Sequence, residues 1–458
     1  MTDERRDGRR RIVIVGGGFA GLYAARRLGR LPVDVTLIDR RNFHLFQPLL
    51  YQVATGGLSP GDIASPLRGA LSRYRNVSVL QGTVTDVDPG ARTVKMDGRP
   101  IPWDDLLIAV GGTLSYFGHD DWRRHAPGLK TVEDALEMRR RILSAFERAE
   151  GGDSAMERSR LQTVVIVGGG PTGVELAGAV AELAYQTLRN DFRRIDPGAT
   201  RIILVEAGDR VLGAYPEDCS RAALETLSGM GVEIRLHTTV AAVENDAVYI
   251  ATNGSEERIA TETVLWGAGI RAVPLADRIA QRCGAGQDRA GRIRVDEHLS
   301  IPGHPSIMVL GDVAHVRGPD GGPLPGVAQV AMQQGRYAAD RIELRLAGRD
   351  SPPFRYRDKG SLAVIGRNRA VADIGRFNMS GFPAWLVWVF IHIAYLIEFD
   401  NKILVLFQWA YNYFTRKRGA RLITEDGAPF LQPDGETGVT ETPADPSSAG
   451  HRPQPGDS

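Results

Sequence analysis

The chain has 458 residues with a formal net charge of +1, and 43% of them are hydrophobic. A chain of this length has room for about three domains with substantial cores, and its balanced charge excludes a general electrostatic attraction to nucleic acid. The two cysteines, Cys219 and Cys283, lie too far apart for a redox pair and have no partners at the spacing of a zinc or iron–sulfur site, so we expect no metal and a reducing compartment.

The first element expected is a buried strand at residues 11–15 (RIVIV), and no apolar signal core precedes it, so we do not expect export. The strand leads into GGGFAG and an apolar helix. This fits the dinucleotide pattern G-x-G-x-x-G, in which the glycines allow a tight turn, the approach of a pyrophosphate and close helix packing. The turn residues expected to bind a dinucleotide are Gly16, Gly17, Gly18, Ala20 and Gly21. Asp39 ends the next strand, where a carboxylate can bind a ribose hydroxyl.

The same pattern recurs at residues 161–183, where a strand precedes GGGPTG and a second apolar helix. Its glycines are Gly168, Gly170 and Gly173, and Glu206 ends the following strand. A carboxylate at that place accepts a free 2′-hydroxyl and repels a 2′-phosphate, which favours NADH over NADPH. Two such units predict two dinucleotides, and we expect FAD in the first and NADH in the second.

A third signal lies at residues 306–314 (SIMVLGDVA), an apolar strand that ends in Gly311 and Asp312. This places a carboxylate at the edge of a sheet where ligands bind, although an aspartate there can also serve as a turn or cap residue.

Residues 326–335 (GVAQVAMQQG) predict a helix that presents Gln329 and Gln333 on one face. An uncharged amide can hold a neutral carbonyl in an apolar cavity, but glutamine is more often an exposed surface residue. The residues alone leave both interpretations open.

Several stretches together resemble the type II NADH:quinone oxidoreductases, single-subunit flavoenzymes that do not pump protons. The most specific are FQPLLYQVATGGLSP and AQVAMQQG, and further matches are SYFGHDDW, VLWGAGI, VLGDVA and GSLAVIGRNRAVADI. The resemblance covers roughly residues 11–424.

The resemblance implies an α/β fold with two Rossmann-like domains and a C-terminal membrane-associating helical region. The expected division is an FAD domain at 11–115 and 285–345, an NADH domain at 116–284, a membrane-association region at 346–423 and a disordered tail at 424–458. By resemblance Asp39 holds the adenosine ribose of FAD, Asp312 its ribityl chain and Glu206 the ribose of NADH. Further contacts to the dinucleotides are implied for Gln47, Val84, Gly111, Gly269 and Ala328.

The resemblance also implies the catalytic residues. Glu175 is similar to the family's acidic residue beside nicotinamide and flavin, although a carboxylate in the first turn of a helix is also favourable by itself. Gln329 and Gln333 are implied to line the site of a membrane quinone, ubiquinone or menaquinone. Met332 stands where some relatives carry a histidine, which leaves the proton donor to the quinone open.

Residues 382–399 are almost wholly apolar but short for a membrane span, and residues 401–421 predict an amphipathic helix with a basic end. Trp385, Trp388 and Trp409 suit the headgroup zone, and Arg416, Lys417, Arg418 and Arg421 suit anionic lipid. We expect a peripheral or monotopic protein on the cytoplasmic side of the cell membrane. A dimer interface or a buried helix bundle is the alternative, and a homodimer is compatible with either.

The function predicted from the sequence is therefore hydride transfer from NADH to FAD and electron transfer on to a quinone. Two alternatives remain: a soluble FAD- and NADH-dependent reductase of a protein acceptor, and a nucleotide-binding redox sensor with slow turnover.

Overall fold

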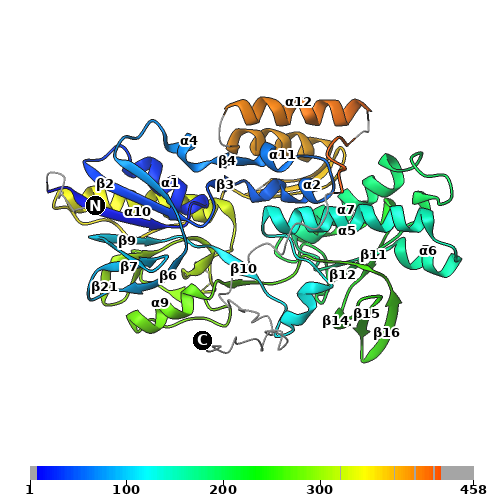
Figure 1. The fold of residues 1–458 in the computed structure, drawn as a ribbon, viewed down its shortest axis with the longest axis horizontal. Coiled ribbons are helices and arrows are strands. Elements are labelled where there is room, and N and C mark those ends of the chain that lie inside the picture. Colours follow the sequence, from blue (N-terminus) through cyan, green and yellow to red (C-terminus); the bar gives the residue numbers. More distant parts are fainter. Residues whose placement is uncertain (1–7, 320, 376, 397–398, 416–417, 424–458) are drawn as a thin grey trace, which may run out of the picture. The chain divides into compact units, whose positions relative to one another are not determined.

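A computed structural model describes residues 8–319, 321–375, 377–396, 399–415 and 418–423, and its main elements are labelled in Figure 1. The expected disordered tail at 424–458 lies outside these residues. Two mainly parallel sheets with helices around them form the centre of the fold, as the repeated strand–turn–helix pattern predicts.

The first sheet joins strands from distant parts of the sequence. Its order is β20 (Ser300–Ile301), β21 (His304–Val309), β9 (Asp105–Ile108), β1 (Arg10–Val15), β2 (Val33–Asp39) and β5 (Val77–Gln81). β9 pairs in parallel with β1 on one side and with β21 on the other. Helices α1 (Phe19–Leu28) and α10 (Ala328–Leu346) pack against each other. A Cβ atom on Gly335 would lie 2.2 Å from the carbonyl oxygen of Ala20, so only glycine permits this approach.

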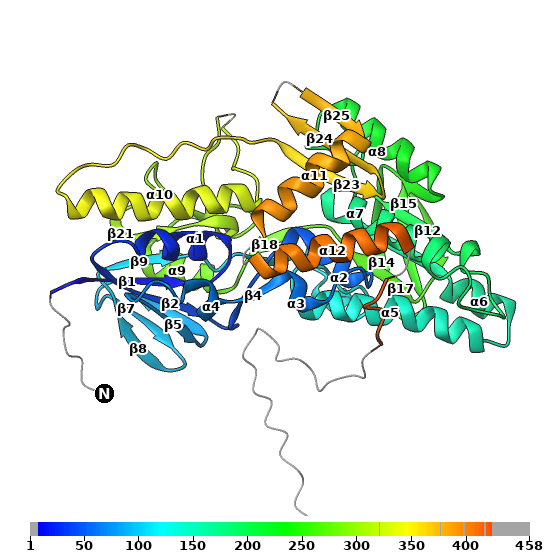
Figure 2. The same cartoon turned by 90° about the horizontal axis from the view of Figure 1, so that it is seen from above.

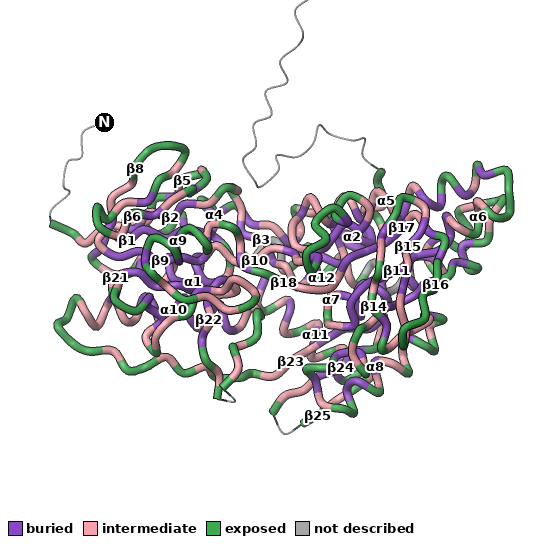
Figure 3. Tube along the Cα trace, turned by 90° about the horizontal axis from the view of Figure 1, so that it is seen from below, coloured by how far each residue is buried: buried purple, intermediate pink, exposed green. Residues whose placement is uncertain are grey.

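The second sheet is continuous in sequence and wholly parallel. Its order is β13 (Val232–Arg235), β12 (Arg201–Val205), β11 (Thr163–Val167) and β17 (Thr263–Trp266). The helices of this part are α5 (Val132–Gly151), α6 (Ala155–Leu161), α7 (Pro171–Glu182) and α8 (Glu217–Gly229). Buried residues concentrate along the central strands of both sheets (Figure 3), as continuous runs of valine, isoleucine and leucine dictate.

Smaller sheets complete these two parts. β6 (Val84–Asp88), β7 (Thr93–Met96) and β8 (Arg99–Pro102) form one antiparallel sheet, and β14 (Thr238–Val243), β15 (Ala247–Thr252) and β16 (Ser255–Ala260) form another. The strands β10 (Gly112–Leu114) and β18 (Ile270–Ala272) pair antiparallel and link the two parts. The shorter elements are β3 (Phe43–Leu45), η1 (Gln47–Leu49), α2 (Leu50–Ala54), α3 (Pro60–Ile63), β4 (Ala64–Pro66), α4 (Leu67–Leu71), η2 (Asp120–Arg124), the π-helical turn η3 (Leu183–Thr187), η4 (Pro197–Ala199), α9 (Leu275–Cys283), β19 (Ile293–Arg294), η5 (Gly311–Val313) and β22 (Ala314–His315).

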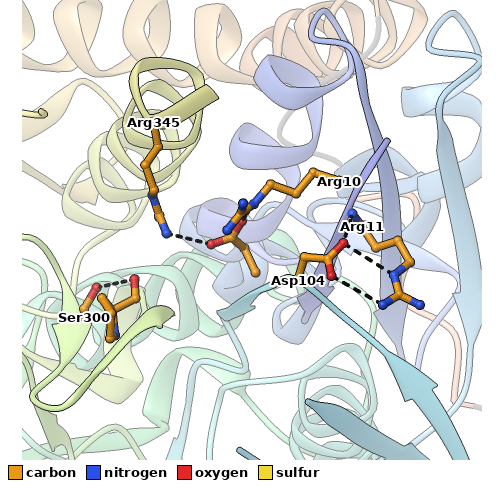
Figure 4. Close-up of polar contacts among 7 residues, drawn as sticks. Arg10, Arg11, Asp104, Ser300 and Arg345 are labelled. Atoms are coloured by element: carbon orange, nitrogen blue, oxygen red, sulfur yellow. Dashed lines mark hydrogen bonds and ion pairs between the residues drawn. The ribbon is translucent and has the colours of Figure 1, made fainter. Parts of the chain in front are cut away.

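A buried carboxylate fastens α10 to the first sheet. Asp105, fully buried on β9, is hydrogen-bonded by Nε of Arg10 and lies 2.9 Å from Nη1 of Arg345 on α10. Arg10 and Arg345 approach the carboxylate from two sides in Figure 4, where Arg11 pairs separately with Asp104. The buried charge is thus doubly compensated, which a carboxylate in a protein interior requires.

The C-terminal region begins with an extended connection. Residues 349–360 have no regular secondary structure and run beside α10 toward β23 (Figure 2). They lead into an antiparallel sheet of β23 (Ser361–Gly366), β24 (Arg369–Ile374) and β25 (Phe377–Gly381), and then into α11 (Phe382–Tyr395) and α12 (Phe399–Thr415). Helix α7 packs tightly on β23: a Cβ atom on Gly178 would lie 1.6 Å from the carbonyl oxygen of Ile365.

The two C-terminal helices expose apolar side chains on one side and bury aromatic ones on the other. The exposed set, which we call the C-terminal apolar face, comprises Phe382, Leu386, Phe390, Ile403, Leu404, Leu406 and Phe407. Of the helices in the described residues, none is long and apolar enough to cross a membrane.

The predicted placement of the tryptophans at lipid headgroups is wrong for Trp388, which is buried, whereas Trp409 is partly exposed. Trp388 is only 2% exposed and stacks on His392 and Trp409. The indole N–H of Trp409 donates to Oε1 of Gln52 at 2.7 Å. Both rings hold α11 and α12 to each other and to the body of the protein, because ring stacking and the part-buried hydrogen bond to Gln52 stabilise them there.

The structure describes two of the four residues of the predicted basic end, Arg418 and Arg421. Arg418 donates to Glu182 at 3.1 Å and to the carbonyl oxygen of Thr55 at 3.0 Å, and Arg421 pairs with Asp191. These two arginines are therefore each paired with a carboxylate of the protein, and contact of the basic end with anionic lipid stays a prediction. Arg416 and Lys417 lie outside the described residues.

Candidate active site

The first glycine turn has the shape that a dinucleotide pyrophosphate requires. Gly16 has φ +105°, and a Cβ atom on Gly21 would lie 1.8 Å from the carbonyl oxygen of Gly16. A Cβ on Gly18, which precedes α1, would meet nothing within 4 Å, so the backbone at the start of this helix is open to a ligand. Ala20 is buried and its backbone carbonyl faces Gly335 of α10, and its contact with a dinucleotide stays a prediction. The turn joins a strand to a helix N-terminus, where backbone N–H groups can bind phosphate.

Asp39 lies at the end of β2 directly beside this turn. Its carboxylate accepts the N–H of Gly17 at 2.6 Å and the N–H of Arg41 at 2.7 Å. Burial raises the pKa of Asp39 above its usual value, while these two bonds and the neighbouring Arg40 and Arg41 oppose the shift. Each carboxylate oxygen retains a lone pair, so Asp39 can still accept a bond from a ribose hydroxyl.

The second glycine turn repeats this geometry in detail. Gly168 has φ +106°, and a Cβ atom on Gly173 would lie 1.8 Å from the carbonyl oxygen of Gly168. Glu206 accepts the N–H of Gly169 at 2.5 Å and that of Gly208 at 2.7 Å, in the same way as Asp39 does at the first turn. Gly170 is open to solvent like Gly18. The two halves therefore present matched sites for two dinucleotides.

A third group gathers around Asp312 in η5. Its carboxylate forms an ion pair with Nζ of Lys130 at 2.9 Å, and both side chains are largely buried. Gln47 donates to the backbone carbonyl of Lys130 at 3.2 Å, which brings two predicted site residues to one lysine. Sequence reasoning missed Lys130, whose only signal was its place in the stretch GLKTVEDA.

The remaining predicted residues lie around these turns in different settings. Gly111 follows β9 with φ +73°, and Gly269 follows β17 with φ +73°, each at the end of a strand that neighbours a glycine turn. Ala328 is the first residue of α10. Val84 is 8% exposed at the start of β6 and packs in the core of the first sheet.

Glu175 lies on α7 between the second glycine turn and the C-terminal sheet. It sits beyond the first turn of the helix, so favourable placement at the helix start does not account for it. Burial raises the pKa of Glu175 to about 8, although the nearby backbone N–H of Val364 on β23 favours the charged carboxylate and opposes the shift. Tyr51 and Tyr215 lie near enough for the Glu175 charge to raise the pKa of each. The carboxyl is thus largely protonated at neutral pH and can act as an acid.

Gln329 and Gln333 share the face of α10 that meets the extended connection. Nε2 of Gln329 donates to the carbonyl oxygen of Gly360 at 2.8 Å, and its Oε1 accepts the N–H of Lys359 at 3.2 Å. Nε2 of Gln333 donates to the carbonyl oxygen of Arg357 at 2.8 Å, and its Oε1 accepts the N–H of the same residue at 3.0 Å. Neither amide is a solvated surface group, and each keeps one further N–H for a ligand.

Comparison with known proteins identifies the family. The family profile for pyridine nucleotide-disulphide oxidoreductases matches residues 10–335, and the NDH2 C-terminal domain matches residues 359–418. A type II NADH:quinone oxidoreductase of Mycobacterium tuberculosis is 44% identical over 428 residues, which cover 92% of this chain and 91% of that one. The chain belongs to the type II NADH:quinone oxidoreductases.

More distant relatives agree with this assignment. A demethylphylloquinone reductase of Synechocystis is 31% identical over 88% of the chain and 96% of its own length. The structure of NDH2 from Plasmodium falciparum has a TM-score of 0.83 at 20% identity, covering 91% of this chain and all of that one, and shows the shared fold.

Membership in the type II NADH:quinone oxidoreductases confirms the predicted activity, in which electrons pass from NADH through FAD to a quinone without proton pumping. It decides against a reductase of a protein acceptor and against a redox sensor. The geometry fits this result: the two glycine turns can hold FAD and NADH, and Cys219 and Cys283 are both free, so no disulfide relay takes part.

Proposed function

We propose that residues 11–115 and 285–345 hold FAD, that residues 116–284 hold NADH, and that the quinone is reduced where these parts meet residues 346–423. The matched glycine turns support the assignment of the two dinucleotides. Bound FAD supplies the redox chemistry, since it accepts a hydride and passes on two electrons. The residues of the chain bind, orient and move protons around it.

Glu175 carries the proton transfer in this proposal. A carboxyl with a pKa of about 8 holds a proton at neutral pH and can release it to a quinone that takes up two electrons and two protons. Its place supports the role, because α7 begins at the NADH turn and packs on β23 of the C-terminal region. The buried carboxyl between the two parts is the observation that carries the proposal.

Gln329 and Gln333 hold the quinone carbonyl through their remaining N–H groups. The amides are fixed by the backbone of residues 357–360, so they are already oriented before a ligand arrives. Such preorganisation reduces the entropy lost on binding. Glu206 holds the ribose of NADH and disfavours the 2′-phosphate of NADPH.

The C-terminal apolar face places the enzyme on a lipid surface, where a membrane quinone is available. Exposed side chains on two adjacent helices support this, with Phe390 at 75% and Phe407 at 73% exposure. Burial in lipid rather than attraction to anionic headgroups provides the driving force, because Arg418 and Arg421 already pair with the protein. We propose peripheral attachment on the cytoplasmic side, and a homodimer through the same face is the competing arrangement.

The experiment that tests this function is stopped-flow absorbance of the flavin in purified protein. The protein is mixed first with NADH and then with a short-chain quinone, in wild type, Gln329→Ala and Glu175→Gln. Fast bleaching by NADH, with reoxidation by quinone slowed in both variants, is expected. Variants that reoxidise as fast as wild type would overturn the assigned residues.

A further inference from the structure

The extended connection at residues 349–360 is ordered by side chains of α10 and not by secondary structure. Most of its residues are exposed, and it makes no strand pairing. A structureless segment of this length inside a compact fold usually has a function, and it needs specific contacts to stay in one conformation. Figure 2 shows it running beside α10 before it enters β23.

Three side chains on one face of α10 bind the backbone of this connection in order. Tyr337 donates its hydroxyl to the carbonyl oxygen of Pro352 at 2.7 Å. Gln333 bonds both the N–H and the C=O of Arg357, and Gln329 bonds the N–H of Lys359 and the C=O of Gly360. We call Gln329, Gln333 and Tyr337 the α10 ladder.

Between the two glutamines the spacing matches that of an extended chain, because their partners Arg357 and Lys359 are two residues apart; Pro352, the partner of Tyr337, lies five residues before Arg357. Four residues of an α-helix rise about 6 Å, and two residues of an extended segment span about 6.6 Å. Each glutamine offers the same donor and acceptor pair as a peptide group, so it acts as one unit of a neighbouring β-strand. A shift of the connection by one residue would present the wrong backbone groups, so the ladder sets its register.

The last bond of the ladder fixes the start of β23. Gly360 has φ +90°, and a Cβ atom there would lie 2.1 Å from the carbonyl oxygen of Asp373 on β24. The chain then runs as a strand to Val364, whose N–H lies near the carboxylate of Glu175 and favours its charged form. Gln329 is thus joined to Glu175 through one short, straight stretch of backbone.

We propose that the α10 ladder fixes the register of residues 352–360, and that Gln329 acts through Gly360 and β23 to position the N–H of Val364 against Glu175. The glutamines are therefore positioning residues for the acid as well as ligands of the quinone carbonyl. This inference deepens the proposed function and rests on it for the role of Glu175.

Two tyrosines lie close enough to Glu175 to affect its pKa. Tyr51 on α2 and Tyr215 before α8 face it, and burial keeps the pKa of both phenols above the usual value. Neither tyrosine bonds a ladder side chain in the bonds described, but Tyr215 donates its hydroxyl to the carbonyl oxygen of Leu362 on β23 at 3.2 Å. A change at Gln329 therefore reaches Glu175 through β23, which Tyr215 also helps to hold.

Hydrogen–deuterium exchange tests the ladder directly in the full holoenzyme. In Gln333→Ala the amide of Arg357 loses its acceptor, and in Gln329→Ala the amide of Lys359 does, so each should exchange roughly tenfold faster. Arg336→Ala is the matched control, because its side chain leaves the same helix toward Tyr23 and should leave both amides unchanged. Unchanged exchange of Arg357 and Lys359 in the two glutamine variants would overturn the ladder.

The pH profile of flavin reoxidation at saturating quinone tests the link to Glu175. The N–H of Val364 favours the charged carboxylate, so its displacement in Gln329→Ala should move the midpoint upward by about half a pH unit or more. Gln333→Ala should move it less, because Arg357 lies further from β23. If Glu175→Gln keeps the wild-type profile, the proposed function fails while the exchange result stands; if only Gln329→Ala keeps it, the link proposed here fails.

Discussion

The titration of Glu175 gives the sharpest prediction for the reaction. Its pKa of about 8 arises from burial, which disfavours the charged carboxylate. With that pKa, roughly nine tenths of these carboxyls carry a proton at pH 7 and roughly one tenth at pH 9. If Glu175 delivers a proton to the quinone, the reoxidation rate should fall about tenfold across this interval.

The sign follows from the direction of the shift. A raised pKa means that the protonated, active form predominates below pH 7 and is lost as the pH rises through 8. The same shift predicts that the contribution of this group to stability declines between the usual glutamate pKa and pH 8, since the unfolded chain releases the proton earlier.

The assay is stopped-flow reoxidation of NADH-reduced flavin by a short-chain quinone between pH 6 and pH 9.5. Glu175→Gln keeps the shape of the side chain but carries no titratable proton, so its profile should be flat and slow. Tyr116→Phe is the control, because this buried phenol donates to the carbonyl oxygen of Ala126 and not to β23, and the variant should keep the wild-type midpoint. A wild-type rate independent of pH, or the same fall in Glu175→Gln, would refute the reasoning.

Three further predictions concern specificity, stability and attachment. Glu206→Ser removes the carboxylate beside the ribose, so the ratio of kcat/KM for NADH over NADPH should fall by about tenfold or more in steady-state assays. Asp105→Asn leaves Arg10 and Arg345 facing a neutral amide. We expect the apparent free energy of urea unfolding to fall by about 2–3 kcal/mol. This is less than the full cost of breaking a buried ion pair, because both arginines are about one-third exposed. Phe390→Ser with Phe407→Ser should reduce co-sedimentation with phospholipid vesicles without lowering the melting temperature, since both rings are exposed.

Each of these has a control and a contrary outcome. If Glu206→Ser keeps the wild-type preference for NADH, the carboxylate is not the group that discriminates against NADPH. For the buried pair, Asp104→Asn breaks a more exposed pair with Arg11 and should cost much less; equal costs would show that burial of Asp105 is not the cause. For attachment, Phe377→Ser removes an equally exposed ring on β25 outside the C-terminal apolar face. If vesicle binding survives the double change but dimerisation is lost, the face is a subunit interface.

Features that depend on local sequence could be predicted. The glycine turns, Asp39 and Glu206 all follow from a strand, a turn and a helix in succession, because the required backbone angles and the next strand's end are set within a short stretch. The exposed face of α12 also follows from its periodicity at Leu404 and Phe407.

Features that depend on residues far apart in the sequence could not be predicted. The pairing of Lys130 with Asp312 and that of Arg418 with Glu182 join residues that no pattern relates. The sequence does not show whether Trp388 contacts lipid or the core, because a helix that is apolar all round has no polar face to distinguish its buried side. The backbone partners of Gln329 were hidden because the connection that supplies them has no periodicity of its own.

The order of the first sheet has a consequence for how the chain folds during synthesis. β9 has its partner β1 as soon as residues 105–108 leave the ribosome, but its other partner, β21, is made only after the whole second sheet. One edge of β9 therefore stays unpaired while residues 163–266 fold beside it, and an open strand edge invites wrong pairing. The sheet is complete only after residues 304–309 have been synthesised. Arg345 can then bind Asp105 and hold α10 against the sheet. Truncation anywhere before α10 should consequently leave a nascent chain that depends on chaperones, whereas the second sheet can already be stable.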